Sequence, residues 1–252
     1  MFDSIWWVLL LPILGSILCA FQSKELGRTG TGSVACLSIL GAFAVSLYHL
    51  VNYSFPHQYV AWTWLRLPLE RGFQFDTLQF DVGAYVDGLT VVMLAVVTGV
   101  AFLIHLYSTE YMSDEIDYGR YFASLNLFVA TMVCLVLANN LVMLLIGWGG
   151  VGYASYSLIG FYSEKPSALA AARKAFLINV VGDIGLMVAI FQIASTIGSV
   201  NYSDTIGNVN SLKILAPQAT LIGMCLLLAA YAKSAQLPLH TWLPDAMEGP
   251  TP

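Results

Sequence analysis

MFDSIWWVLLLPILGSILCAF, residues 1–21, is an apolar run that is long enough to approach one membrane crossing. A hydrocarbon core about 30 Å thick needs about 20 mostly apolar residues in a helix. The run begins almost at once, without a basic leading region or a small-residue cleavage site, so we expect a retained first span. In the whole chain 58% of residues are hydrophobic and 10% are charged, against roughly 25% charged residues in soluble domains. This composition excludes a soluble core protein.

Further stretches of this kind predict an all-α polytopic membrane protein with about seven transmembrane helices. We expect the spans at residues 5–22, 34–52, 86–107, 121–138, 141–162, 174–197 and 218–237. Lysine and arginine favour loops one, three and five over loops two and six, by six residues to three. The positive-inside rule therefore predicts an external N-terminus, with residues 165–174 on the cytoplasmic or matrix side.

The long second loop alternates large apolar and polar residues at positions 60–65 and again at 73–76. This alternation predicts a short external β-hairpin, with ProLeuGluArgGly between the strands. Trp62 and Trp64 suit either a membrane-interface belt or a hairpin face packed on neighbouring helices. We therefore divide the chain into residues 1–84, with two spans and the hairpin, and residues 85–252, with spans three to seven.

Lys233 is a charged residue late in the seventh span, where burial in lipid costs several kcal/mol on insertion scales. It could carry a proton, or its ammonium could extend to the membrane surface. Pro238 and Pro244 follow and should break the helix just beyond the lysine. Interrupted helices at membrane depth are tolerated only within protein or around water-filled cavities. This pattern favours the proton-carrying interpretation.

Other polar residues near the spans are fewer and less decisive. Asp183, about one-third of the way into the sixth span, could be a relay carboxylate facing Lys233 or a structural acid. His240 titrates near neutral pH, which suits proton transfer, but a structural histidine fits equally well. We expect His105 to be a structural donor near the interface and Asp87 to cap the third span.

Composition argues against two classes of site. The four cysteines lie singly in apolar runs, without paired metal-ligand spacing, so we expect neither a disulfide framework nor a metal or iron–sulfur site in this chain. The net charge of −5 leaves no basic face for a nucleic acid.

The stretch KSAQLPLHTWLPDAMEGPTP, residues 233–252, closely resembles the signature of subunit L (chain 5) of NADH:quinone oxidoreductase, respiratory complex I. HLYSTEYM (105–112), GWGGVGYASYSLIGF (147–161) and VGDIGL (181–186) are similar to further parts of that family. The resemblance implies an antiporter-like fold of two inverted repeats, each with a broken helix. The chain would hold most of the first repeat and lack the second.

The resemblance also implies a function in proton translocation, in an energy-transducing bacterial plasma membrane or mitochondrial inner membrane. Lys233 matches the family's lysine in the first broken helix, and Asp183 matches the acid of its ValGlyAsp motif. No cofactor is expected in this chain, because NADH, FMN, iron–sulfur clusters and quinone belong to other subunits. The implied partners are the other membrane-arm subunits of complex I and lipid.

The chain departs from the family pattern at two positions and in its length. Gly149 stands where the family has a glutamate in the fifth span, and Val180 stands where it has an arginine. Gly149 suggests a half-channel that is impaired, retuned or served by Asp183; alternatively, it serves only helix packing. The missing second repeat suggests a second chain that carries the C-terminal half, a truncated product or a partial sequence.

Two other functions fit parts of the pattern. The related large membrane component of multi-subunit sodium/proton antiporters shares the broken helix and its lysine, although the C-terminal motif looks more like the complex I form. A structural subunit that no longer pumps is the other alternative, suggested by Gly149 and the short length.

Overall fold

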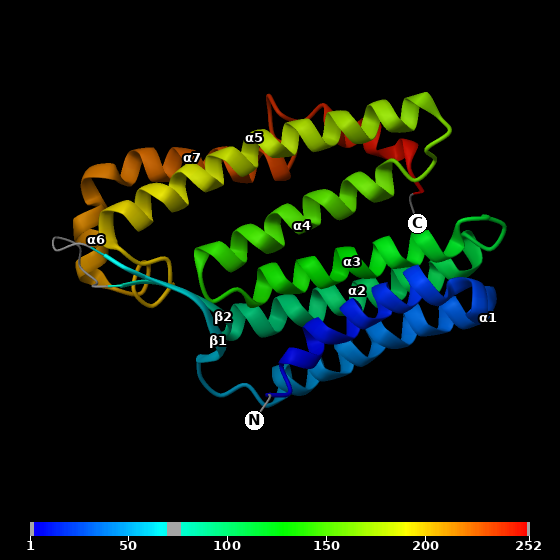
Figure 1. Cartoon of the computed structure of the whole chain (residues 1–252), viewed down its shortest axis with the longest axis horizontal. Coiled ribbons are helices and arrows are strands. Elements are labelled where there is room, and N and C mark those ends of the chain that lie inside the picture. The colour runs from blue at the N-terminus through cyan, green and yellow to red at the C-terminus, as the bar shows by residue number, and fades with distance from the viewer. Residues whose placement is uncertain (1–2, 70–76, 251–252) are drawn as a thin grey trace.

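The computed structural model describes residues 3–69 and 77–250. It shows long helices running roughly alongside one another, with a β-hairpin near one end (Figure 1). The elements are α1 (Trp6–Val51), β1 (His57–Pro68), β2 (Thr77–Val86), α2 (Gly88–Tyr111), α3 (Tyr118–Leu137), α4 (Leu141–Ile159), α5 (Pro166–Ile197), α6 (Val209–Leu215), η1 (Ala216–Gln218), α7 (Ala219–Lys233), α8 (Trp242–Asp245) and η2 (Ala246–Glu248). This confirms the predicted helical membrane fold with a small antiparallel sheet.

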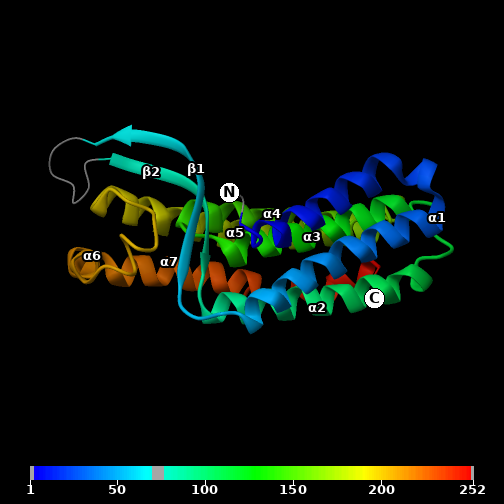
Figure 2. The ribbon, with the colours of Figure 1, turned by 90° about the horizontal axis from the view of Figure 1, so that it is seen from below.

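Helix α1 is long enough for two membrane crossings. Its 46 residues would extend about 69 Å as one straight helix, far more than a bilayer core of about 30 Å. Gly27 interrupts it with φ +66° and ψ −179°, a conformation that glycine adopts readily because it lacks a Cβ. The two halves fold back on each other as a helical hairpin (Figure 2). They correspond to the predicted spans at residues 5–22 and 34–52.

The remaining helices confirm the predicted spans but correct two boundaries. Helices α2 to α5, and α6 followed by α7, are each long and apolar enough to cross a membrane. Helix α5 begins at Pro166 rather than at residue 174, since proline suits the first turn of a helix. Asp183 therefore lies near the middle of α5, not one-third of the way along it. Helix α7 ends at Lys233 rather than at residue 237.

The predicted β-hairpin is present, and its described second strand is β2. β1 and β2 pair antiparallel, from His57 opposite Val86 to Pro68 opposite Thr77. β2 therefore runs on to the start of α2, past residue 84, and the expected strand at 73–76 lies outside the described residues. Trp62 and Trp64 are 56% and 67% exposed, so neither side chain is packed away within this chain.

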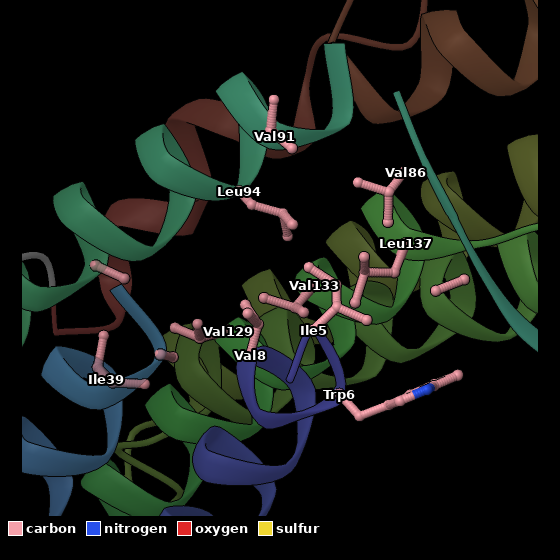
Figure 3. Close-up of a cluster of buried hydrophobic side chains, with 13 residues drawn as sticks. Ile5, Trp6, Val8, Ile39, Val86, Val91, Leu94, Val129, Val133 and Leu137 are labelled. Carbon is pink, nitrogen blue, oxygen red and sulfur yellow. The ribbon is translucent and has the colours of Figure 1, made fainter. Parts of the chain in front are cut away.

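A group of buried aliphatic side chains joins the two halves of α1 to α2 and α3 (Figure 3). It includes Ile5, Val8, Ile39, Val91, Leu94, Val129, Val133 and Leu137. A second group joins α5 to α4 and α7. Lipid tails are as apolar as leucine, so close packing rather than removal from water holds such helices together. The bundle thus has two packed halves that meet at α3 and α4.

Asn140 connects the β-hairpin to the start of α4. Its side-chain oxygen accepts hydrogen bonds from the backbone N–H groups of Val142 and Met143, at 3.0 and 2.9 Å. Its side-chain nitrogen donates to the backbone oxygen of Asp81 in β2, at 2.6 Å. One buried amide therefore both caps a helix and holds the sheet against it.

We expect Asn140→Ala to lower the free energy of unfolding by about 1–3 kcal/mol, because it removes the helix cap and the buried hydrogen bond to the Asp81 backbone oxygen. Asn140→Asp keeps the accepting oxygen and should recover part of the loss. Thermal unfolding in detergent measures both variants, with Asn52→Ala as the control because Asn52 is exposed and bonds only within its own helix end. Equal melting temperatures for Asn140→Ala and Asn52→Ala would contradict this role.

Candidate functional site

Lys233 is the last residue of α7, and its side chain crosses to α4. The Nζ atom donates a hydrogen bond to the backbone oxygen of Trp148, at 3.1 Å. The same atom lies 5.7 Å from the centre of the Trp148 ring, within the range of a cation–π interaction. A Cβ atom added to Gly152 would lie 3.1 Å from this nitrogen. The ammonium is therefore directed at the middle of α4.

Asp183 lies on α5 close to the same point. Its carboxylate interacts electrostatically with Lys233 and lies beside the Trp148 indole. The Oδ1 atom of Asp183 and the Nε1 atom of Trp148 are both buried and have no hydrogen-bond partner among the described residues. The described residues also contain no ion pair between Asp183 and Lys233. The acid and the base thus both lie beside Trp148, and the described residues show no ion pair between them.

Two glycines explain why Asp183 comes so near to α7. A Cβ atom on Gly182 would lie 2.6 Å from Cβ of Ala232, and one on Gly185 would lie 2.8 Å from the backbone oxygen of Cys225. Small residues of this kind allow membrane helices to approach closely. Figure 1 shows α5 and α7 running side by side. The ValGlyAspIleGly motif therefore packs on α7 on both sides of the acid.

The chain beyond Lys233 is not helical until α8. Ala235 has φ +50°, and Pro238 lies within this break, whereas Pro244 lies inside α8. The Trp242 indole N–H donates to the backbone oxygen of Ala232, at 3.0 Å. The segment after the break is thereby folded against the final turn of α7, directly beside the lysine.

An ion pair attaches the same segment to α5. Lys174 Nζ and Asp245 Oδ2 are 2.8 Å apart, with both side chains partly exposed. An exposed pair contributes about 0–1 kcal/mol, so this contact orients α8 more than it stabilises the fold.

The histidines and Asp87 lie apart from this cluster. His240 is exposed, and no hydrogen bond of the described residues joins its side chain to Lys233 or Asp183. His105 is fully buried in α2, where Nδ1 contacts the backbone oxygen of Ala101 at 2.8 Å. Asp87 caps α2 as predicted, accepting from the Thr90 N–H at 2.7 Å. The structure therefore brings together Lys233 and Asp183, and leaves His240 outside.

Gly149 has free space where its side chain would be. A Cβ atom added there meets no atom of the described residues within 4 Å, whereas one on Gly150 would lie 2.6 Å from the Thr131 methyl carbon. Packing within this chain consequently does not require glycine at position 149. Gly149 lies three residues before Gly152 on α4, and residues three apart are neighbours on a helix surface. A Cβ at Gly152 would lie 3.1 Å from Lys233 Nζ, so a longer side chain at position 149 could approach the lysine.

Trp148 is the site residue that sequence reasoning missed. It contacts Lys233 through its backbone oxygen, and any residue type presents such an atom. The one available signal was its position immediately before Gly149 in a matched motif.

Two family models match the chain. The model described as NADH:quinone oxidoreductase/Mrp antiporter, TM, matches residues 138–252, which include Lys233, Asp183 and Trp148. The model described as NADH-Ubiquinone oxidoreductase (complex I), chain 5 N-terminus, matches residues 73–122.

Curated relatives match nearly all of the chain. NADH-quinone oxidoreductase subunit L of Mycobacterium tuberculosis (strain ATCC 25618 / H37Rv) is 41% identical over 98% of this chain and 38% of that protein. Subunit L of Escherichia coli (strain K12) is 40% identical over 97% of this chain and 39% of that protein. NADH-ubiquinone oxidoreductase chain 5 of Metridium senile is 38% identical over 97% of this chain and 40% of that protein. The chain thus spans about two-fifths of the length of these relatives.

Among solved structures, the Mrp complex from Dietzia sp. DQ12-45-1b matches with a TM-score of 0.80. The match covers 98% of this chain and 25% of that one, at 22% sequence identity, so it shows a shared fold. Together with the sequence relatives, it confirms the antiporter-like fold. By these matches, the chain is homologous to the N-terminal part of NADH-quinone oxidoreductase subunit L and NADH-ubiquinone oxidoreductase chain 5.

Proposed function

We propose that this chain is part of a proton-translocating membrane-arm subunit of NADH:quinone oxidoreductase, and that Lys233 carries the proton. The observation that supports this most is the position of Lys233 at the end of interrupted α7, hydrogen-bonded to Trp148 on α4 and facing Asp183 on α5. Ionisable groups inside membrane spans are rare because they are costly, and they commonly mark ion pathways.

In the proposed mechanism, Lys233 alternates between an ammonium and a neutral amine. As an ammonium it donates to the Trp148 oxygen and is attracted by Asp183. As an amine it no longer interacts with the charge of Asp183, whose unpartnered Oδ1 can then accept a hydrogen bond from another donor. Moving one charge across the membrane costs about 2.3 kcal/mol per 100 mV, so protonation and access must change together. The non-helical segment after Lys233 is the element that can couple them.

The similarity to these relatives supports further parts of this proposal. Redox chemistry with NADH, FMN, iron–sulfur clusters and quinone takes place in other subunits, and this chain contacts neighbouring membrane-arm subunits and lipid. The N-terminus faces outward in an energy-transducing membrane, with the 160–165 loop on the cytoplasmic or matrix side. His240 is proposed only as an outer proton acceptor, since it lies in the break but outside the Lys233–Asp183 cluster.

A sodium/proton exchanger is the second candidate function. The fold shared with the Mrp complex supports it, whereas the higher sequence identity to subunit L and chain 5 supports the complex I function. The two candidate functions differ in the process that drives proton translocation, which is NADH oxidation in the first and sodium exchange in the second.

Inverted membrane vesicles from the source organism test the proposed function. NADH oxidation should drive proton uptake when the chain is present, and deleting the chain should abolish NADH-driven uptake while succinate-driven uptake continues. Mass spectrometry of proteins that co-purify with the tagged chain in mild detergent should identify NADH-oxidising subunits. Sodium-dependent proton flux without NADH, together with co-purifying antiporter subunits alone, would instead establish the exchanger.

We expect Gly149→Glu to fold normally and to change the rate of proton translocation several-fold. A Cβ at this position meets none of the described atoms that surround it within 4 Å, and a carboxylate there would add a negative charge that attracts the Lys233 ammonium. Proton uptake per NADH oxidised measures the effect, with Gly149→Gln as an uncharged control of equal size. An unchanged proton-to-electron ratio and rate would rule out the idea that the glycine impairs or retunes this half-channel.

A further inference from the structure

A cavity of about 420 Å³ lies where α1 turns back, beside the end of α2 and the start of α3. Its lining includes Arg28, Thr29 and Ser33 from α1, Thr109 from α2 and Ser113 from the loop after it. A smaller cavity of about 180 Å³ lies on the other side of Arg28 and is lined by Lys24 as well. Neither cavity has a carboxylate of the described residues in its lining.

Several hydrogen-bond donors around the larger cavity have no partner among the described residues. Arg28 forms no ion pair and no hydrogen bond in the part of the chain that the structure describes, and the same holds for the Thr29 and Ser113 hydroxyls. The Ser33 hydroxyl, by contrast, donates to the Thr29 backbone oxygen at 2.8 Å. A guanidinium with five N–H groups and two free hydroxyls suits an anionic oxygen ligand, above all a phosphate.

One end of the larger cavity is lined by less polar side chains. Cys36 on α1 and Leu106 on α2 line it. Leu40 and Leu103 lie one helical turn further along the same faces and are 39% and 63% exposed. A ligand bound here would meet charge at one end and hydrocarbon at the other.

Two tyrosines mark the level of the membrane surface at this end. Tyr107 and Tyr111, on the last turns of α2, are exposed and stack with ring centres 5.6 Å apart. Exposed aromatic side chains gather where hydrocarbon meets headgroups. We therefore expect Arg28 at headgroup level and Leu103 deeper in the membrane.

We propose that the Arg28 cavity binds an anionic phospholipid, with the headgroup phosphate on Arg28, Thr29 and Ser113 and an acyl chain along Leu106 and Leu103. Basic pockets between transmembrane helices recognise anionic headgroups in this way. The less polar end selects a lipid over free phosphate. The Gly27 turn places Arg28 between the two cavities, so the helical hairpin of α1 builds the site.

Native mass spectrometry of the complex that contains this chain tests the proposal, after reconstitution in phosphatidylcholine with or without phosphatidylglycerol. The wild type should retain phosphatidylglycerol, and Arg28→Gln should retain about fivefold less, as expected for one basic residue at the membrane surface. Lys213→Gln removes an equal charge from α6, near the opposite end of the bundle. This variant should retain as much phosphatidylglycerol as the wild type.

A second variant tests the cavity itself. Ser33→Phe fills the space while keeping Arg28, and it should reduce phosphatidylglycerol retention as strongly as Arg28→Gln. Equal retention in wild type and Arg28→Gln, or an equal loss in Lys213→Gln, would overturn the proposal. Displacement of the lipid by millimolar inorganic phosphate would show that the site takes free phosphate instead, and would overturn the assignment to lipid.

Discussion

Lys233→Met should slow proton translocation through this chain about a hundredfold, the lower end of what a positioned proton-transfer group contributes. Methionine preserves the length and apolar stem of the side chain but removes the titratable nitrogen. It also removes the donor to the Trp148 oxygen and the positive partner of Asp183. NADH-driven proton uptake by inverted vesicles measures the loss, with Lys213→Met as a control at an exposed lysine of α6.

Lys233→Arg separates a proton carrier from a structural cation. A guanidinium keeps the positive charge opposite Asp183 and can still donate to the Trp148 oxygen, but it is not deprotonated in proteins. A proton carrier should therefore fail as arginine as fully as it fails as methionine. Normal pumping by Lys233→Arg would show that only the charge matters, and normal pumping by Lys233→Met would favour the non-pumping structural subunit. The amount of assembled complex, measured on native gels, controls for misfolding.

Gly147→Ala should lower the free energy of unfolding by about 3 kcal/mol, at the upper end of the usual cost of overpacking. A Cβ atom there would lie 2.5 Å from the backbone nitrogen of Leu135 and 2.7 Å from its Cα. A flexible side chain could rotate away from a new methyl group, but backbone cannot, so α3 and α4 must separate. The junction between the two packed halves of the bundle would then loosen.

Gly149→Ala is the matched control for that variant, two residues along the same helix. The added Cβ meets none of the surrounding described residues within 4 Å, and alanine favours helix over glycine by about 1 kcal/mol, so stability should be equal or slightly higher. Thermal unfolding of the purified protein in one detergent compares the two variants. Equal melting temperatures would mean that α3 and α4 can separate at little cost.

The apolar spans could be predicted because a bilayer imposes one length on every crossing. Residues 34–52 and 121–138 were placed nearly correctly on that ground alone, and the Asp87 cap followed from the chemistry of a helix start. The start of α5 was misplaced because residues 166–173 contain Pro166 and Arg173, which hydropathy counts as a loop. A helix can extend beyond the hydrocarbon layer, and composition does not reveal how far.

Part of the candidate site could be predicted from the sequence for a different reason. Lys233 and Asp183 could be identified from the sequence because a charge in an apolar segment is costly. The structure places both residues beside Trp148. Trp148 and the glycines beside Asp183 could not be singled out in that way. Their roles depend on a backbone oxygen and on the missing Cβ atoms that let α5 approach α7, and both arise only from the packing of separate helices.

The indole of Trp242 couples the segment after the break to the last turn of α7, which holds Lys233. Its N–H is attached to the oxygen of Ala232, one peptide unit before Lys233, while Asp245 on the same short helix is attached to α5. A displacement of α8, in either direction, must pull on the final turn of α7 or release it. Movement that begins outside this chain can therefore reach Lys233 through the hydrogen bond between the Trp242 indole and the Ala232 oxygen.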